Sequence, residues 1–491
     1  MVHATPTKVL LATTLRPLVV QLSGPLAQGV RLLDQLFHDA LTPRTMAVFE
    51  RQLHALLREA GRRIMAWVLT HLEPQNDAEA PSRLQFAGQL YRRRGTYRST
   101  VATLFGTVQV WRRLYEPLEH KGHSLHPLEL RLGLEAGIAT PALAERVGQW
   151  TADHTQRQVL EMLEKDHTVH WSCTSLRKVL SSLRAGMTTH RHVSQVEQVM
   201  HWLAQAHVSQ GRYRPTLAVG RDGVFVPLCH KVWQEGATAT VSVFDRRGKR
   251  LGTVYLGQMP EPGQGTLTTQ LNALLHDLLS QVDSQGLRLV YVTDDGYHPS
   301  DYYHNVLQKM PDPRRPWRYV EWIRSIDYYH ACQYVQQLAD VIFGPGAESQ
   351  QWAKRMRAQL QTRTHGVTRV LQSAAALRHK RGLWGQAKVY AQAYAYLHKR
   401  RQWMCYQSYR RQHLPIGSGI TEAACKIVFT QRLKRSGMAW TREGGQVILD
   451  LRVIWLSGVW KAVHQRYLVS KPRPVTHVHR AKGAQPEQQA A

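Results

Sequence analysis

Cysteines and long apolar runs are scarce in this 491-residue chain. Its five cysteines stand far apart, without a Cys-x-x-Cys pair, which excludes an obvious zinc ribbon and gives no disulfide framework. No run of 18 apolar residues occurs, and the N-terminal residues lack the long apolar segment of a secretory signal. We therefore expect a cytoplasmic protein that does not associate with membranes.

Acidic side chains are scarce as well. The chain has 64 Lys and Arg residues against 35 Asp and Glu residues, a formal charge of +29. Such an excess attracts polyanions, and contacts to phosphates release counterions and make binding salt-dependent. The scarcity is sharpest from Gln350 to Arg442, where 19 basic residues accompany one acid, Glu422. We expect nucleic acid as the partner, and Glu422 is either half of a helical Glu422–Lys426 pair or a group kept for metal or proton chemistry.

The hydrophobic pattern divides the chain into several regions. We expect an N-terminal helical region over 1–90, although residues 1 to about 30 show no clear period and are expected to be poorly ordered. Further regions are a basic β ribbon with helices for DNA binding over 91–210, an α/β core over 211–330, a very basic helical region over 331–413, closing helices over 414–465 and a disordered basic tail over 466–491.

The expected ribbon lies between Tyr91 and Tyr115 and turns at Gly106. Bases and aromatic residues alternate in it, including Arg92, Arg93 and Arg94, as suits a phosphate backbone. A solvated hairpin packed on helices is the alternative. The three helices expected over 127–185 are compatible with a helix-turn-helix or with ordinary three-helix packing.

The core region has three consecutive strands (216–228, 237–244 and 250–256), a helix (267–279), a strand (287–293), a short helix (300–310) and a strand (318–326). This is the element order of the ribonuclease H-like fold. We therefore expect a mixed sheet flanked by helices, interrupted by the helical region before the closing helices.

Three acids lie where such a fold would bring them together. Two-metal phosphodiester chemistry needs three or four carboxylates around two Mg²⁺ ions about 4 Å apart. Asp222 lies within an apolar strand, Asp294 ends the later strand with Asp295 as the adjacent alternative, and Glu422 lies on a late helix. As ordinary structural residues, Asp222 would be part of an Asp-Gly turn and Asp294 a helix cap.

From about 90 to 460 the chain resembles the DDE transposases of bacterial insertion sequences, in the Mutator-like group of the Kra type. The resemblance rests on four motifs: Asp222-Gly; Val292-Thr-Asp294-Asp-Gly-Tyr-His-Pro; Ile326-Asp327-Tyr-Tyr-His330-Ala-Cys; and Pro415-Ile-Gly-Ser-Gly-Ile-Thr-Glu422-Ala-Ala-Cys-Lys with Thr430-Gln-Arg-Leu-Lys-Arg-Ser-Gly-Met438. It implies that Asp222, Asp294 and Glu422 are the catalytic triad and metal ligands. The cysteine-rich module that many relatives carry near the N-terminus is missing here.

The resemblance also implies further roles. Asp327 and His330 would support the site, the helical region over 331–413 would be an insertion domain, and Mg²⁺ would be the cofactor, with Mn²⁺ as a substitute. Contacts to DNA are expected from the basic residues near Glu422 as well as from the ribbon, namely Lys426, Arg432, Lys434 and Arg435.

We therefore expect a nucleoid-associated bacterial transposase. It would bind double-stranded DNA at the terminal inverted repeats of its insertion sequence, cut a strand at each end and join the end to target DNA. Two ends imply a homo-oligomer that is at least a dimer on DNA. The alternatives are an inactive DNA-binding protein derived from a transposase, and a ribonuclease H-like nuclease or resolvase.

Overall fold

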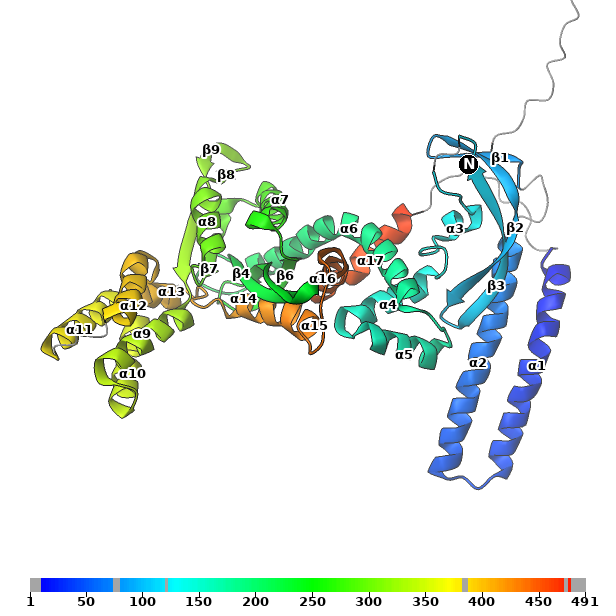
Figure 1. Ribbon diagram of the computed structural model, residues 1–491, viewed down its shortest axis with the longest axis horizontal. Coiled ribbons are helices and arrows are strands. Elements are labelled where there is room, and N and C mark those ends of the chain that lie inside the picture. The colour runs from blue at the N-terminus through cyan, green and yellow to red at the C-terminus, as the bar shows by residue number, and fades with distance from the viewer. Residues whose placement is uncertain (1–9, 74–79, 120–121, 382–386, 472–475, 478–491) are drawn as a thin grey trace, which may run out of the picture. The chain divides into compact units, whose positions relative to one another are not determined.

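The computed structural model describes residues 10–73, 80–119, 122–381, 387–471 and 476–477. Two compact units make up the chain (Figure 1). Unit 1 comprises Met1–Met187 with His464–Ala491, and unit 2 comprises Thr188–Val463. The long helix α6 (Cys173–Val208) begins in unit 1 and ends in unit 2. No helix within the described ranges is both long enough and apolar enough to cross a membrane.

Unit 1 combines a helical hairpin, a four-stranded sheet and several shorter helices. Its helices, besides the start of α6 and the end of α17 (Trp460–Ser470), are α1 (Leu10–His38), α2 (Pro43–Leu72), α3 (Pro127–Leu132), α4 (Pro141–Asp153) and α5 (Gln156–His167). The sheet has the order β11-β1-β2-β3, formed by β11 (Thr476–His477), β1 (Arg83–Phe86), β2 (Gln89–Thr103) and β3 (Gly106–Pro117). The predicted ribbon is thus the β2–β3 hairpin.

Two expectations for unit 1 are corrected. The N-terminal segment was expected to be poorly ordered to about residue 30, but α1 begins at Leu10 and runs for 29 residues. The tail was expected to be disordered from 466, but α17 continues to Ser470, and Thr476–His477 adds a short strand beside β1. Residues 1–9, 472–475 and 478–491 lie outside the described residues.

Unit 2 is built on a mixed five-stranded sheet in the order β10-β7-β4-β5-β6. Its strands are β4 (Thr216–Leu228), β5 (Val232–Phe244), β6 (Arg250–Gln258), β7 (Arg288–Thr293) and β10 (Trp322–Ile326). β5 is antiparallel to β4 and β6, whereas β7 is parallel to β4 and β10. The Asp245 carboxylate closes the β5–β6 turn by accepting hydrogen bonds from the backbone N–H groups of Arg247 and Lys249.

Helices cover both faces of this sheet. Those after β6 are α7 (Gly265–Gln281), α8 (Tyr297–Asn305), α9 (Tyr328–Phe343), α10 (Ala347–Thr362), α11 (Gly366–Lys380), α12 (Ala387–Arg400), α13 (Tyr406–Arg411), α14 (Gly419–Ala424), α15 (Gln431–Leu433) and α16 (Arg442–Leu456). Helices α9–α13, yellow-green to gold in Figure 1, fill the predicted very basic helical region. The single strand expected over 318–326 is instead two, since β9 (Arg315–Tyr319) pairs with β8 (Pro311–Asp312) and only β10 joins the large sheet.

Strand alternation decides what each face contacts. Leu217, Val219 and Tyr291 point to the face that packs against α6, α7 and α8. Ala218 and Val292 point to the other face and share a core with helices α9–α13. Asp222 lies four residues after Ala218, and Asp294 lies two residues after Val292. Because every second side chain points to the same face, both aspartates belong to the face that α9–α13 cover.

Glycines on this second face let the helix after residue 418 approach the sheet. A Cβ atom on Gly220 of β4 would lie 2.0 Å from the Thr421 hydroxyl, and one on Gly236 of β5 would lie 2.9 Å from the Phe429 ring. The Thr421 and Thr240 hydroxyls are 3.0 Å apart and hydrogen-bonded. Close backbone approach of this kind requires glycine. Gly220 thereby fixes how near α14, which carries Glu422, lies to β4.

Gly220→Ala should push α14 away from β4, because the new methyl group would overlap Thr421. We expect a loss of about 1–3 kcal/mol in the free energy of unfolding, measured by urea denaturation, together with a fall in any activity that needs Glu422. Gly419→Ala is the matched control, because Gly419 begins the same helix and a Cβ atom there would meet nothing within 4 Å. Equal losses in both variants would contradict the role assigned to Gly220.

Candidate active site

Three neighbouring strands bring three aspartates level with one another, Asp222 within β4 and Asp294 and Asp327 directly after β7 and β10. β4 and β7 pair in parallel from Thr216↔Arg288 to Val219↔Tyr291, and continuing this register places Asp222 opposite Asp294. β7 and β10 pair up to Thr293↔Ile326, so the next position in β10 is Asp327. The Asp327 amide donates a 2.8 Å hydrogen bond to the Thr293 carbonyl, which continues the ladder.

Glu422 reaches the same face from α14. A buried carboxylate fixes the start of this helix: Asp327 accepts hydrogen bonds from both the backbone N–H and the hydroxyl of Ser418. The Glu422 amide in turn donates to the Ser418 carbonyl at 2.9 Å. The Glu422 side chain is exposed. Asp327, which directly follows β10, therefore fixes the start of the helix that carries Glu422.

The electrostatics show that the three predicted acids influence one another. Burial, aided by the negative charges of Asp294 and Glu422, raises the pKa of Asp222 to about 6. The pKa of Glu422 is also raised, first by the partial loss of water around its carboxyl group and then by Asp327 and Asp294, while His330 opposes the shift. The structure thus places Asp222, Asp294 and Glu422, which lie far apart in the sequence, near enough for their charges to act on one another.

Asp295 differs from Asp294 in its partners. Its carboxylate forms ion pairs with the guanidinium groups of Arg324 and Arg400 and is almost fully buried. Asp294 has no ion pair among the described residues, and one of its carboxylate oxygens accepts a 3.1 Å hydrogen bond from the Gly296 amide. Because two arginines already neutralise Asp295, the geometry favours Asp294 as the acid that serves the site.

Asp327 and His330 have positions that suit supporting roles. Asp327 caps α9 by accepting a 2.7 Å hydrogen bond from the His330 amide, in addition to its bonds with Ser418. The His330 ring packs edge-on against Tyr334 and Tyr396, with ring centroids 5.3 and 5.6 Å away. Asp327 is therefore a positioning residue, and His330 contributes packing and positive potential near Glu422.

Cys425 is a member of the site that the sequence did not single out. Its thiol donates to the Asp222 carboxylate over 3.4 Å, and burial together with Asp222 raises the pKa of the thiol. It lies three residues after Glu422, a spacing that puts both side chains on one side of a helix. The segment Cys425–Thr430 is a π-helix, a distortion that often occurs at functional sites.

The donor set suits a hard divalent cation. Carboxylate oxygens are the ligands that Mg²⁺ prefers, and a cation would relieve the mutual repulsion that raises the pKa of Asp222. As they stand, no three His, Cys, Asp or Glu side chains of the described ranges are close enough to hold a metal ion together. Asp222, Asp294 and Glu422 are the residues that would hold it.

The basic residues near Glu422 do not all face solvent. Lys426 and Arg435 are exposed, and the Lys434 ammonium lies 5.5 Å from the centre of the Trp233 ring. Arg432 was expected among the DNA contacts, but its side chain is fully buried and its guanidinium lies 5.5 Å from the centre of the Trp440 ring. Arg432 is therefore removed from the set that could meet phosphate.

The three arginines of the β2 strand also differ in their surroundings. Arg92 and Arg94 are exposed, and Arg94 lies 3.7 Å from the Glu116 carboxylate of the paired strand. Arg93 is half-buried and donates a 2.9 Å hydrogen bond to the Ala80 carbonyl. Arg92 and Arg94 thus remain available to a phosphate backbone, whereas Arg93 is held by the fold.

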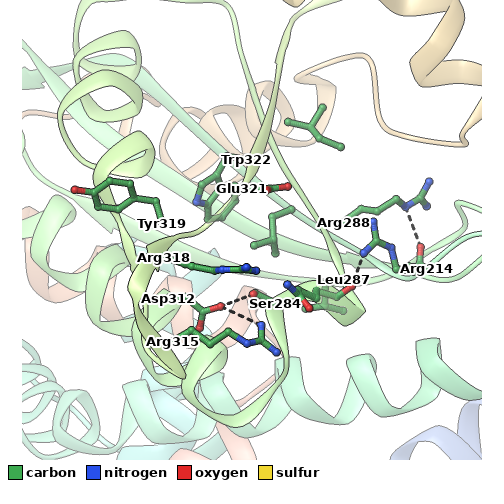
Figure 2. Close-up of a pocket in the computed structure, with 13 residues that line it drawn as sticks. Arg214, Ser284, Leu287, Arg288, Asp312, Arg315, Arg318, Tyr319, Glu321 and Trp322 are labelled. Carbon is green, nitrogen blue, oxygen red and sulfur yellow. Dashed lines mark hydrogen bonds and ion pairs between the residues drawn. The ribbon is translucent and has the colours of Figure 1, made fainter.

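A hollow of about 300 Å³ lies at the opposite edge of the unit 2 sheet, by the amino ends of β7 and β10 (Figure 2). Arg288 donates to the carbonyls of Arg214 and Gln412, and Arg315 pairs with Asp283 at 3.0 Å. Two of the four arginines in this hollow are therefore held by the neighbouring loops, and the hollow lies at the other ends of β7 and β10 from Asp294 and Asp327.

No family model matches the chain, and the comparison with curated proteins finds no match.

Asp222→Asn should stabilise the metal-free protein at neutral pH. Since folding raises the pKa of Asp222 to about 6, wild-type stability falls as the pH rises from about 4 to 6 and the desolvated carboxylate ionises. The variant avoids this cost, so its free energy of unfolding at pH 7.5 should exceed that of wild type by at most about 3 kcal/mol. The gain should vanish below pH 4, as measured by denaturant unfolding with EDTA.

Asp295→Asn provides the contrast, because this variant removes the partner of two arginines and should destabilise the protein by about 3–5 kcal/mol. A gain for Asp222→Asn that is the same at pH 4 and pH 7.5 would show that the carboxylate charge is not its cause.

Proposed function

We propose that the protein is a DDE-type DNA transposase. It would bind the terminal inverted repeats of an insertion sequence, cleave a DNA strand at each end and transfer that end to target DNA with Mg²⁺ or Mn²⁺ as cofactor. The observation that carries this proposal is that the register of β4 and β7 aligns Asp222 with Asp294, while the helix that carries Glu422 packs on β4 and β5 through Thr421 and Cys425.

The sheet supports a ribonuclease H-like core. In that fold the carboxylates come from the first strand, from the neighbouring fourth strand and from a late helix. Here β4 is the first of the five strands in chain order, lies directly beside the fourth, β7, and is antiparallel to the second, β5. Asp222 lies on the first strand, Asp294 follows the fourth, and Glu422 lies on α14. The placement of the acids and the strand order therefore favour the same fold.

Each residue of the site has a defined task in this proposal. When bound, two divalent ions would activate the attacking oxygen and stabilise the leaving oxygen of the phosphodiester. Asp222, Asp294 and Glu422 would hold the ions, Asp327 fixes α14 through Ser418, and Cys425 orients the Asp222 carboxylate through its thiol. Exposed Lys426 and Arg435 would contact the phosphates on either side of the cut.

The charge distribution supports DNA as the substrate. The single acid between Gln350 and Arg442 is a proposed metal ligand. Additional carboxylates there would repel a DNA backbone, whereas one that binds a cation would not. The helices α10–α13 supply this basic region beside the sheet that carries the site.

Glu422→Gln should abolish cleavage of the DNA ends of the element that encodes the protein. Loss of one ligand removes charge that holds the ions, so we expect a fall of about 10³-fold in the rate, since metal-ion catalysis contributes several kcal/mol. The assay incubates labelled ends and target DNA with Mg²⁺ or Mn²⁺ and follows cutting and joining on gels. Glu348→Gln, at an exposed position on α10, is the matched control.

The products distinguish the three candidate functions. Cutting followed by joining supports a transposase, and cutting without joining supports a nuclease or resolvase. Binding of the ends without any cutting by wild type supports an inactive DNA-binding descendant. Full activity of Glu422→Gln would remove Glu422 from the site.

Lys426→Gln should weaken DNA binding at every sequence and lower its salt dependence. If the Lys426 ammonium contacts one phosphate, the slope of log affinity against log salt should fall in magnitude by about 0.9. Fluorescence anisotropy with a labelled duplex between 50 and 300 mM NaCl measures both effects. Lys309→Gln, at an exposed position after α8, should leave the slope unchanged; an equal change in both variants would indicate a bulk charge effect.

A further inference from the structure

The helical hairpin α1–α2 of unit 1 carries an uncovered row of large apolar side chains. On α1 these are Val19, Leu26, Val30, Leu33 and Phe37, whose exposed fractions lie between 47% and 79%. Their spacings of seven, four, three and four residues are those of a coiled-coil seam. Such a regular row differs from isolated exposed apolar residues, which are common on protein surfaces.

A second row on α1 already serves the contact with α2. Leu18, Pro25, Gly29 and Leu32 are buried or half-buried, and each precedes a member of the exposed row by one residue. A Cβ atom on Gly29 would lie 3.2 Å from Leu56 of α2, which shows that this row faces α2. The apolar stripe of α1 is therefore about twice as wide as a two-helix contact needs, as in helices that face the core of a larger bundle.

Helix α2 adds to the same uncovered surface. Met46, Leu57 and Ile64 are exposed. The residue directly before Leu57 and the residue directly before Ile64 each contact α1. These preceding residues are Leu56, which packs near Gly29, and Arg63, which donates to the Gln21 carbonyl at 2.6 Å. An advance of one residue turns a helix by about 100°. Because the two helices are antiparallel, this advance turns both rows to one side of the hairpin.

The opposite side of the hairpin is polar. On α1, Gln21, Gln28 and Gln35 each precede a half-buried residue by one position (Leu22, Gly29 and Leu36), and on α2 Gln52 and Glu59 likewise precede the half-buried Leu53 and Ala60. Gln21, Gln28, Gln35 and Gln52 are exposed. The hairpin thus has one apolar side and one polar side, a division that a free-standing two-helix hairpin in water does not require.

We propose that the apolar side of the α1–α2 hairpin is a dimer interface, on which the same side of a second copy of this chain packs to form a four-helix bundle. The row from Val19 to Phe37 is about 27 Å long, and two adjacent helices are about 20 Å wide. Roughly 500 Å² per copy, or about 1,000 Å² in total, would be buried, which reaches the size of a specific interface.

Charge favours a second copy as the occupant. The row on α1 from Val19 to Phe37 has no charged residue at its seam positions, and the same side of α2 carries one acid, Glu50, and no Lys or Arg between Met46 and Ile64, in a chain with 64 of them. Two copies can therefore approach along this side without bringing positive charges into contact. A patch that pairs with itself about a two-fold axis satisfies the commonest symmetry of oligomers. This inference goes beyond the proposed function and does not depend on it.

The test is the mass in solution of the full-length protein, freed of nucleic acid by nuclease treatment. Light scattering and sedimentation at 0.15 M and 1 M NaCl should give twice the chain mass of 56.2 kDa for wild type. The dimer should persist at high salt because its interface is apolar, whereas DNA binding weakens with salt. The Leu26→Glu, Leu33→Glu double variant should be monomeric, with the dimer dissociation constant raised at least about 100-fold.

A matched control adds the same two charges to the polar side of the same helix. The Gln28→Glu, Gln35→Glu double variant should remain dimeric, and circular dichroism should show wild-type helix content for both double variants. The milder Leu33→Gln variant should raise the dissociation constant about tenfold and covers the case in which two glutamates unfold the hairpin. A monomeric wild type, a dimeric Leu26→Glu, Leu33→Glu variant, or loss of the dimer in the control would overturn the proposal.

Discussion

The geometry of the candidate site depends on one buried carboxylate, that of Asp327. It follows the last residue of β10, caps α9 through the His330 amide and holds Ser418 by two hydrogen bonds. A carboxyl group in the interior is tolerated because backbone and hydroxyl donors replace its water. Through this single group the sheet edge, the first of the basic helices and the helix of Glu422 are fixed to one another, across 91 positions of sequence.

Near Asp327 lie further carboxyl groups, those of Asp222, Asp294 and Glu422, whose negative charges repel one another. Burial and the neighbouring carboxylates raise the pKa of Asp222, an unfavourable arrangement that the surrounding apolar packing must offset. The adjacent Asp295 lies in the opposite electrostatic environment, because two arginines neutralise its charge. Two neighbouring aspartates thus have opposite environments. This contrast is typical of a site in which one acid serves function and the other serves structure.

The sequence predicted what depends on strand alternation and missed what depends on distant contacts. Asp222 and Asp294 could be placed because apolar runs mark their strands and register aligns them. The buried position of Arg432 could not be foreseen, because a basic run ordinarily lies on a solvated helix face and nothing local marks the Trp440 ring that it lies over. Likewise, the sequence shows Cys425 only as an isolated cysteine. Its contact with Asp222 depends on how the helix packs against β4.

Helix α1 was missed for a different physical reason. A helix that packs on a single partner shows apolar residues at every third or fourth position. In α1, two such rows lie one residue apart, so apolar pairs such as Leu18-Val19 and Leu32-Leu33 blur the period, and Pro17 and Pro25 count against a helix. The lack of a clear period therefore arises from two faces that both need cover, of which α2 supplies only one. A stripe of that width is itself evidence for a further helical partner. In a single chain, the part of the stripe that such a partner would cover is exposed.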